Sequence, residues 1–201
     1  MKIKVVDTME KFKFVVPSIE WKQQAVEYIN EFYMYNSEIN GTGGLHRYLD
    51  DYEGWLVKLE NDYTTVPSEE RVPARTYFLV RENDNKIVGM INIRLALNEK
   101  LKKYGGHIGY SIRPTERRKG YNKINLYLGL KVCNKYGINE VFMDADKDNP
   151  ASWRTIEAIG GKCIREHFDN EIANCIVKYY IIDVNSAIMA NKDKYELFII
   201  E

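Results

Sequence analysis

The residues best suited to chemistry surround a basic turn between a strand-like run and a helix-like run. Five cationic side chains fall within eleven positions there: Arg113, Arg117, Arg118, Lys119 and Lys123. Backbone N–H groups without partners and the positive end of a helix dipole attract anions at such a turn. Gly120 carries no Cβ, so a ligand can approach the backbone closely. These features predict a cradle for phosphate or pyrophosphate, and a solvated basic turn is the alternative.

The composition limits the kind of protein that carries this turn. The chain has 201 residues with 29 Lys plus Arg and 29 Asp plus Glu, so its net charge is zero. A balanced charge argues against nucleic acid or an anionic membrane as the partner of the whole surface. Neither of the two common glycine-rich nucleotide-binding motifs occurs in the sequence, which weakens those two types of nucleotide site.

The cysteines and the N-terminus indicate the compartment. Cys133, Cys163 and Cys175 are odd in number and lack CxxC spacing, which argues against a disulfide framework or a zinc site. No apolar run approaches the ~18 residues of a membrane span. The N-terminus lacks the apolar core of a secretory signal. We therefore expect a cytoplasmic protein that uses no metal.

The elements that must position the turn follow from apolar periodicity. Residues 76–81 and 86–94 are β-rich runs around the turn 83–85, which predicts a hairpin. Helical spacing over 20–36 predicts an amphipathic helix, and the glycines of 37–50 indicate a mobile loop. The other expected elements are helices at 52–62, 122–136 and 150–159 and in the tail from residue 186, with strands at 107–113, 140–144, 163–168, 173–183 and 197–200. This order predicts a mixed α/β sheet.

Two segments carry a resemblance to a known family. The run Ile112-x-Pro114-x-x-Arg117-Arg118-Lys119-Gly120-x-Asn122 resembles motif A of the GNAT superfamily of acyl-CoA N-acyltransferases. Asn149-Pro150-Ala151-Ser152, closed by Gly160-Gly161, resembles motif B of the same superfamily. The phrases GGHIGYSIRP, ERRKGY and DKDNPAS are similar to a subgroup of bacterial predicted acetyltransferases. The resemblance covers residues 75–182 well.

The resemblance implies a fold and a domain plan. The sheet would be mostly antiparallel, flanked by helices, and splayed between the two central strands 107–113 and 140–144. A single domain would span 1–201, with an N-terminal helical arm at about 1–75, a core at about 76–183 and a C-terminal extension at 184–201.

The resemblance also implies a site for acetyl-CoA as co-substrate. The loop would hold the coenzyme pyrophosphate, and the pantetheine would pair with the backbone near Ile112. Asn149 and Ser152 would contact the pantetheine arm or a phosphate, and a plain N-cap is the alternative for Asn149. The loop residues assigned to the coenzyme are Arg117, Arg118, Lys119, Gly120, Tyr121, Asn122 and Lys123.

The sequence departs from the superfamily pattern at two positions. Asn122 stands where Gly or Ala is usual, and its side chain would crowd the pyrophosphate or donate a hydrogen bond to it. Ile156 stands where many members carry a tyrosine that protonates the leaving thiolate. Coenzyme binding is little affected by these changes, but the usual general acid is missing.

His107 and Asp144 are the candidate catalytic residues. His107 begins a central strand, and its ordinary pKa near ~6.5 suits proton abstraction, whereas a structural role is the alternative. Asp144 ends the neighbouring strand and would act as a base or bind the substrate ammonium. His46, beside the glycine-rich loop, would line the acceptor pocket or lie on the surface.

The function expected from the resemblance is N-acetyl transfer from acetyl-CoA to a primary amine by direct attack in a ternary complex. The acceptor would be a small molecule or a peptide, and a homodimer is possible. The first alternative is a non-catalytic acyl-CoA-binding module, suggested by Ile156 and Asn122. The second is a nucleic-acid-binding protein that uses the basic turn, which the neutral net charge disfavours.

Overall fold

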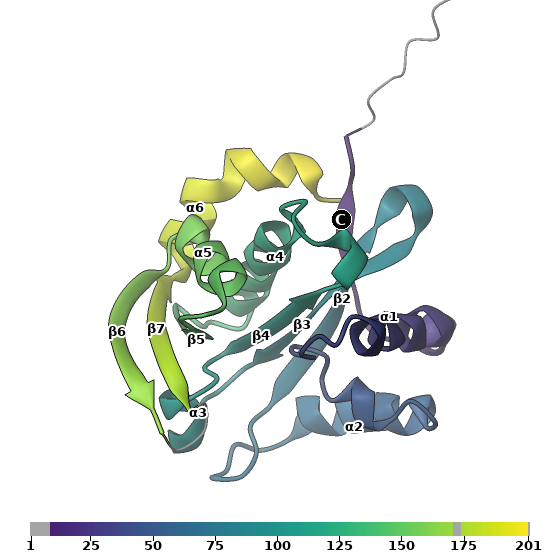
Figure 1. Ribbon diagram of the computed structural model, residues 1–201, viewed down its shortest axis with the longest axis horizontal. Helices are drawn as coiled ribbons and strands as arrows, with labels where there is room; N and C mark the ends of the chain where they lie inside the picture. The colour runs from purple at the N-terminus through teal and green to yellow at the C-terminus, as the bar shows by residue number, and fades with distance from the viewer. Residues whose placement is uncertain (1–8, 171–173, 201) are drawn as a thin grey trace, which may run out of the picture.

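The computed structural model describes residues 9–170 and 174–200, which form two antiparallel sheets with helices on both sides (Figure 1). The first sheet has the order β1-β2-β3-β4, and the second has the order β5-β7-β6. The strands are β1 Phe12–Val15, β2 Ala74–Arg81, β3 Lys86–Arg94, β4 Ile108–Ile112, β5 Glu140–Asp146, β6 Lys162–Asp169 and β7 Cys175–Asp183. The helices are α1 Lys22–Met34, α2 Tyr52–Thr64, α3 Glu99–Lys103, α4 Tyr121–Lys135, α5 Pro150–Ile159 and α6 Val184–Tyr195. The expected mixed, mostly antiparallel α/β class is confirmed.

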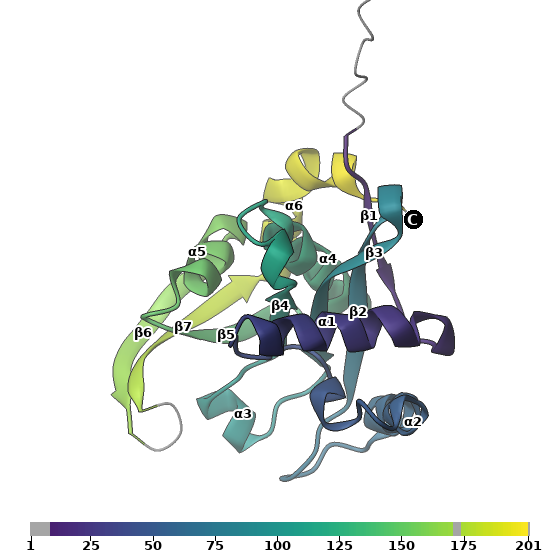
Figure 2. The same cartoon turned by 45° about the vertical axis from the view of Figure 1, so that its right-hand side comes forward.

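The first sheet is covered on both faces by apolar clusters. Successive side chains of a strand point to opposite sides, so neighbouring residues belong to different clusters. Leu79 and Ile91 pack with α4, α5 and α6 in one apolar cluster. Phe78 and Met90 pack with α1 and α2 in a second cluster. Figure 2 shows α1 and α2 on the side of the sheet away from α4. The arm is therefore an integral layer of the fold.

The arm contacts β4 directly. Helix α1 buries Ala25, Tyr28, Ile29 and Phe32, at spacings of three and four residues, and the Tyr28 hydroxyl lies 3.0 Å from Ser111 Oγ on β4. The loop 37–50 also packs on this strand, since a Cβ at Gly41 would collide with the backbone of Gly109 and Tyr110. Close approach and a φ of +69° therefore explain this glycine, and the mobility of the loop stays a prediction.

The two sheets meet at one clasp between His107 and Phe142. The backbone N–H of His107 donates to the carbonyl oxygen of Phe142 at 2.7 Å. The N–H of Phe142 donates to His107 Nδ1 at 3.0 Å, and the two rings stack with centroids 5.9 Å apart. Beyond this clasp, β4 and β5 belong to different sheets. The splay expected between the two central strands is therefore present.

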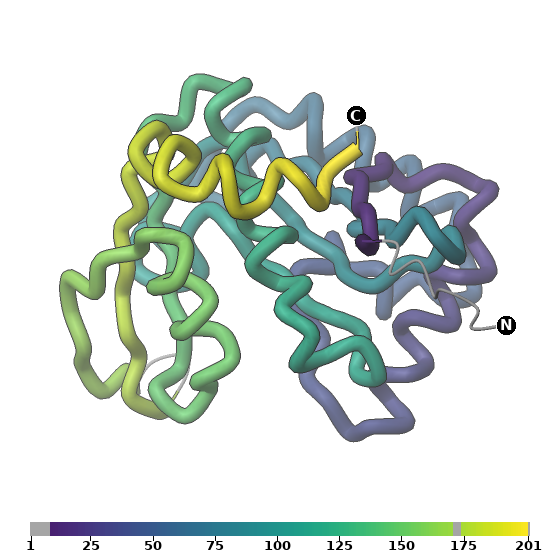
Figure 3. Tube along the Cα trace, turned by 90° about the horizontal axis from the view of Figure 1, so that it is seen from above, coloured from purple at the N-terminus to yellow at the C-terminus, as the bar shows by residue number. Residues whose placement is uncertain are grey.

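The chain ends differ from the sequence-based expectation. A strand was predicted at 197–200, but residues Glu196–Phe198 form a 3-10 turn and only an isolated bridge joins Ile199 to Phe12. Figure 3 shows this C-terminal segment returning to the N-terminal strand. Strand β1 and helix α3 were not predicted. Residue 173, where the last core strand was expected to begin, lies outside the described residues.

No helix in the described part of the chain is long and apolar enough to cross a bilayer.

The clasp predicts a pH-dependent stability. Burial lowers the pKa of His107 to about 4, against ~6.5 in an unfolded chain. Because the folded state resists this proton, the contribution of His107 to stability is present above pH ~6.5 and is lost as the pH falls toward 4. At 1.36 kcal/mol per pKa unit, the loss is roughly 3 kcal/mol at most.

His107→Asn keeps an acceptor for the Phe142 N–H and removes the titration. The free energy of unfolding of this variant, measured in urea between pH 4 and 7, should fall less steeply with acid than that of the parent. His167→Asn, at an exposed histidine of β6, is the control. Parallel pH curves for His107→Asn and the parent would contradict this prediction.

Candidate active site

The basic turn leaves β4 at Arg113 and reaches α4 at Tyr121. A 3-10 turn covers Pro114–Glu116, and Arg118 and Gly120 then adopt positive φ angles of 65° and 85°. A Cβ at Gly120 would meet nothing within 4 Å, so open space lies on that side of the glycine. Residues 117–120 are exposed. The backbone at the start of α4 is therefore accessible to an anion.

Three of the five cations of the turn hold the protein together. Arg113 contacts Glu31 of α1 at 3.2 Å, and Arg117 donates to Ser37 Oγ at 2.7 Å. Lys119 contacts Glu116 at 2.7 Å. Arg118 and Lys123 have no ion-pair partner within the described ranges.

Glu116 is the centre of a buried charge network. Glu116 is 4% exposed, and its carboxylate contacts Arg81 at 2.9 Å and Lys86 at 2.7 Å as well as Lys119. Burial would raise its pKa, but the hydrogen bonds from Lys119, Lys86 and Arg81 outweigh burial and lower it to about 2. Arg81 also donates to the Tyr121 hydroxyl at 3.2 Å. The network joins the turn to β2, β3 and the first residue of α4.

The side chains that begin the two helices beside the splay are already hydrogen-bonded. Asn149 caps α5, since its side chain accepts from the Ser152 N–H at 3.2 Å. Asn122 Oδ1 accepts from Asn125 Nδ2 at 3.4 Å within α4. The N-cap role of Asn149 is therefore confirmed, and contacts of Asn149, Ser152 and Asn122 with a coenzyme stay predictions.

Tyr110 is a candidate site residue that sequence reasoning missed. Its hydroxyl crosses from β4 to α5, where it donates to the Ser152 carbonyl oxygen at 3.2 Å and lies 3.0 Å from Ser152 Oγ. Burial raises the pKa of this phenol, so it keeps its proton at neutral pH. The signal was in the alternation of β4: Ile108, Tyr110 and Ile112 share one face, and a half-buried tyrosine hydroxyl needs a polar partner.

Ile156 is fully buried in the apolar cluster of α4, α5 and α6. The Cγ2 of Ile156 lies so close to Gly161 that a side chain at position 161 would collide with it. Position 156 offers no proton donor. The Tyr110 hydroxyl meets the same helix four residues earlier, at Ser152, on the same side of α5.

Of the two candidate catalytic residues, His107 forms the clasp and Asp144 lies beside it. His107 is 7% exposed, and its Nδ1 already accepts the Phe142 N–H, so the geometry favours a positioning role over proton abstraction. Asp144 Oδ2 accepts the Gly105 N–H at 2.6 Å, and burial raises the pKa of the carboxyl. His46 Nδ1 is buried without a hydrogen-bond partner among the described residues, and burial lowers the pKa of this ring.

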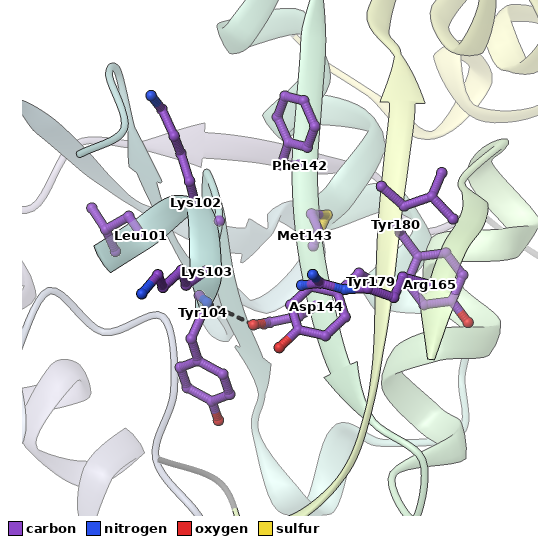
Figure 4. A pocket seen from close by; sticks show the side chains of 13 residues that line it. Leu101, Lys102, Lys103, Tyr104, Phe142, Met143, Asp144, Arg165, Tyr179 and Tyr180 are labelled. Atoms are coloured by element: carbon purple, nitrogen blue, oxygen red, sulfur yellow. Dashed lines mark hydrogen bonds between the residues drawn. The ribbon is translucent and has the colours of Figure 1, made fainter. Parts of the chain in front are cut away.

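Asp144 lines a pocket of about 330 Å³ against α3 and the second sheet (Figure 4). The pocket is lined by Leu101, Lys102, Lys103, Tyr104, Gly105, Gly106, Phe142, Met143, Asp144, Ile164, Arg165, Tyr179 and Tyr180. Phe142 belongs to the clasp, so the pocket begins where the two sheets separate. Within 9–170 and 174–200, no group of three or more His, Cys, Asp or Glu side chains is arranged to hold a metal ion.

Comparisons with solved structures support the fold. Mycobacterium smegmatis RimJ in complex with CoA-disulfide has a TM-score of 0.65 and 11% identity, covering 90% of this chain and 89% of that one. A chimera of the spermidine N-acetyltransferase SpeG from Vibrio cholerae and hSSAT has a TM-score of 0.62 and 12% identity, covering 89% and 98%. The microcin C7 self-immunity acetyltransferase MccE, in complex with acetyl-CoA and AMP, has a TM-score of 0.61 and 14% identity, covering 86% and 92%.

Sequence comparison supplies the family. No curated protein matches the chain. The family model described as Acetyltransferase (GNAT) family matches residues 29–160, which is well over half of the chain and includes the basic turn, the splay and all of α5. The protein therefore belongs to the GNAT acetyltransferase family.

Proposed function

We propose that the protein is an acetyl-CoA-dependent N-acetyltransferase that joins an acetyl group to a primary amine by direct attack in a ternary complex. The observation that carries this proposal is the edge of β4 that faces the splay. Strand β4 pairs with β3 along one edge and ends the first sheet. Its other edge faces the splay, and the chain continues from the end of β4 into the anion-accessible turn at Gly120.

The residues of this edge and turn fit an acyl-CoA. An extended chain that carries amides can add to a free strand edge as a further strand does, which suits the pantetheine beside Ile112. The N–H groups of residues 118–122 and the side chains of Arg118 and Lys123 suit the pyrophosphate, whereas the Lys123 N–H already donates to the Gly120 carbonyl oxygen at 3.1 Å. The Glu116 network holds this backbone in place before any ligand binds, which lowers the ordering cost of binding.

Asp144 is the residue we assign to the amine. Nitrogen attack forms a C–N bond and breaks the C–S bond, so the amine must give up its proton and the thiolate must receive one. Asp144 holds the ammonium in the pocket beside the clasp, and its raised pKa makes it a better proton acceptor than an exposed aspartate. His107 keeps β4 and β5 in register for this step.

Tyr110 is the residue we assign to the leaving thiolate. Its hydroxyl lies between β4 and α5, close to the place where many family members present a tyrosine and this chain has Ile156. A CoA thiol has a pKa near the ~8.5 of cysteine, so a hydrogen bond from a neutral phenol is sufficient help near neutral pH. To give it, the Tyr110 hydroxyl exchanges its hydrogen bond to the Ser152 carbonyl oxygen for one to the sulfur. Transfer should be slow but real, and faster at higher pH as the acceptor loses its proton.

A non-catalytic acyl-CoA-binding module is the second candidate, because Ile156 offers no acid at the usual place. A thiol-release screen with acetyl-CoA across amine classes separates the two, with coenzyme binding measured by calorimetry alongside. Thiol release that depends on an amine supports the enzyme. Tight coenzyme binding without release for any amine would favour the binding module.

Gly120→Val tests the coenzyme turn. The substitution places a β-branched side chain at a φ of +85° in the open space where we expect the pyrophosphate, so the Kd for acetyl-CoA should rise at least tenfold, about 1.4 kcal/mol. Calorimetry measures the Kd directly. Gly137→Val is the matched control, because Gly137 also has a positive φ, of +73°, and open space, but lies at the other end of α4. Equal Kd values for the two folded variants would remove the turn from the site.

Tyr110→Phe tests the proton donor. Removal of the hydroxyl should lower kcat about tenfold or more, since general acid help is typically worth about 10²–10⁴-fold, and should change the acetyl-CoA Kd by less than about threefold. Tyr127→Phe is the control, because the Tyr127 hydroxyl bonds Glu196 away from the splay. If kcat is unchanged in Tyr110→Phe, the thiolate is protonated by another group.

A further inference from the structure

The pocket beside Asp144 carries two opposite charges on one row of the second sheet. Asp144 of β5 lies opposite Tyr179 of β7, and Tyr179 lies opposite Arg165 of β6. Directly opposed residues of neighbouring strands share a face, so all three side chains point into the pocket in Figure 4. Because strands lie about 4.8 Å apart, the backbones of Asp144 and Arg165 are roughly 10 Å apart. The Arg165 side chain reaches back over the Tyr179 ring, so the two charged groups lie closer together than their backbones.

The acidic end of the row is fixed and only partly occupied. One carboxylate oxygen of Asp144 accepts the Gly105 N–H at 2.6 Å. Arg94 lies behind this turn and donates to the carbonyl oxygens of Gly105 and Gly106, each at 2.8 Å. No hydrogen bond to the second oxygen of Asp144 occurs among the described residues. This end is therefore built to receive a donor such as an ammonium.

The basic end of the row is also held in place. The Arg165 guanidinium carbon lies 4.1 Å from the centre of the Tyr179 ring, so the guanidinium packs on that ring. It has no carboxylate partner in the part of the chain that the structure describes. The guanidinium also interacts with the Tyr179 hydroxyl, and because it has five N–H donors, it keeps others for a carboxylate or phosphate. Figure 4 shows Lys102 and Lys103 on the opposite side of the pocket, extending away from Asp144.

The pocket is continuous with the place where transfer would occur. Phe142 and Asp144 share one face of β5, and Phe142 forms the clasp from which β4 and β5 diverge. Asp144 is thus the first side chain on this face after the sheets separate. A molecule held at Asp144 has its amine at the mouth of the splay and the rest of its body directed toward the Arg165 guanidinium, which packs on the Tyr179 ring together with His167.

We propose that this pocket binds the acceptor, and that the acceptor is a small zwitterionic amine whose nitrogen lies at Asp144 and whose carboxylate or phosphate lies at Arg165. The inference rests on the proposed N-acetyl transfer and names its substrate class. The volume of about 330 Å³ is at the lower end of small-molecule pockets, which suits an amino-acid-sized ligand. A diamine of the same length would place its second ammonium at Arg165, where like charges repel.

Matched amines test the charge pattern. Butylamine, 4-aminobutyrate and 1,4-diaminobutane have the same spacing and differ in the far group, and 3-aminopropyl phosphate replaces the carboxylate with a phosphate. In the thiol-release assay, kcat/KM for the better of the two anionic amines should exceed that for butylamine at least tenfold, and the diamine should be the poorest. The order of 4-aminobutyrate and 3-aminopropyl phosphate distinguishes a carboxylate from a phosphate as the natural group.

Two variants of exposed arginines locate the effect. In Arg165→Gln, the kcat/KM ratio of the better anionic amine to butylamine should fall at least tenfold. Arg154→Gln should keep the parent ratio, because Arg154 also packs on an aromatic ring, that of Trp153, but on α5 outside the pocket. Asp144→Asn should lower kcat/KM for every amine.

The outcomes separate this inference from the proposed function. Acetylation of butylamine or 1,4-diaminobutane at least as fast as both anionic amines would overturn the pocket assignment and leave N-acetyl transfer standing. No thiol release with any amine, despite normal acetyl-CoA binding, would overturn the transfer. In that case, calorimetry of the better-binding anionic amine with CoA-saturated protein still tests the pocket, and a Kd that Arg165→Gln does not change would overturn it.

Discussion

The pair of hydrogen bonds between His107 and Phe142 is the constraint on which the rest of the site depends. It joins the two sheets, with the Gly105–Asp144 hydrogen bond beside it, and beyond it β4 and β5 diverge. If the strands were paired throughout, β4 would have no free edge and α5 could not approach it from the side. If they were not joined at all, neither the Asp144 pocket nor the Tyr110 contact would have a fixed position. The partly open sheet therefore supplies both the order and the space that binding needs.

The basic turn owes its shape to carboxylates more than to its own positive charge. Glu31 and Glu116 take up Arg113 and Lys119, and Glu31 also accepts the Thr115 N–H at 2.7 Å. Buried ion pairs gain little net stability, but removal of one partner leaves an uncompensated charge that costs several kcal/mol. The network is therefore better understood as fixing the backbone of the turn. The carboxylates thus neutralise part of the cluster of five cations. Because a nucleic-acid-binding turn needs its cations free, these ion pairs weaken the nucleic-acid alternative.

The sequence predicted elements where local pattern and tertiary packing agree. The 3.6-residue period of α1, the hairpin turn before β3 and the Asn-Pro start of α5 are local signals, and each element lies close to its expected place. Strand β1 was missed because the residues of β2 that pair with it are more than sixty positions away, and four residues alone carry little periodicity. The tail strand failed for the opposite reason: its apolar pattern is real, but Phe12 offers it only one bridge.

The site residues show the same difference between local signals and contacts between distant elements. Gly120 and Asn149 could be singled out because a turn and a helix cap are local features. Tyr110 and Arg165 could not, because their meaning arises from residues in other elements, Ser152 of α5 for one and Asp144 of β5 for the other. A motif also cannot show what a substituted position has become. Ile156 packs tightly against Gly161, so a tyrosine there would overpack the cluster, whereas β4 delivers a hydroxyl to the same helix without disturbing that contact. On our proposal, the family frame is kept and the proton donor comes from the neighbouring strand, which explains how the chain can lack the usual acid and still retain a chemically complete site.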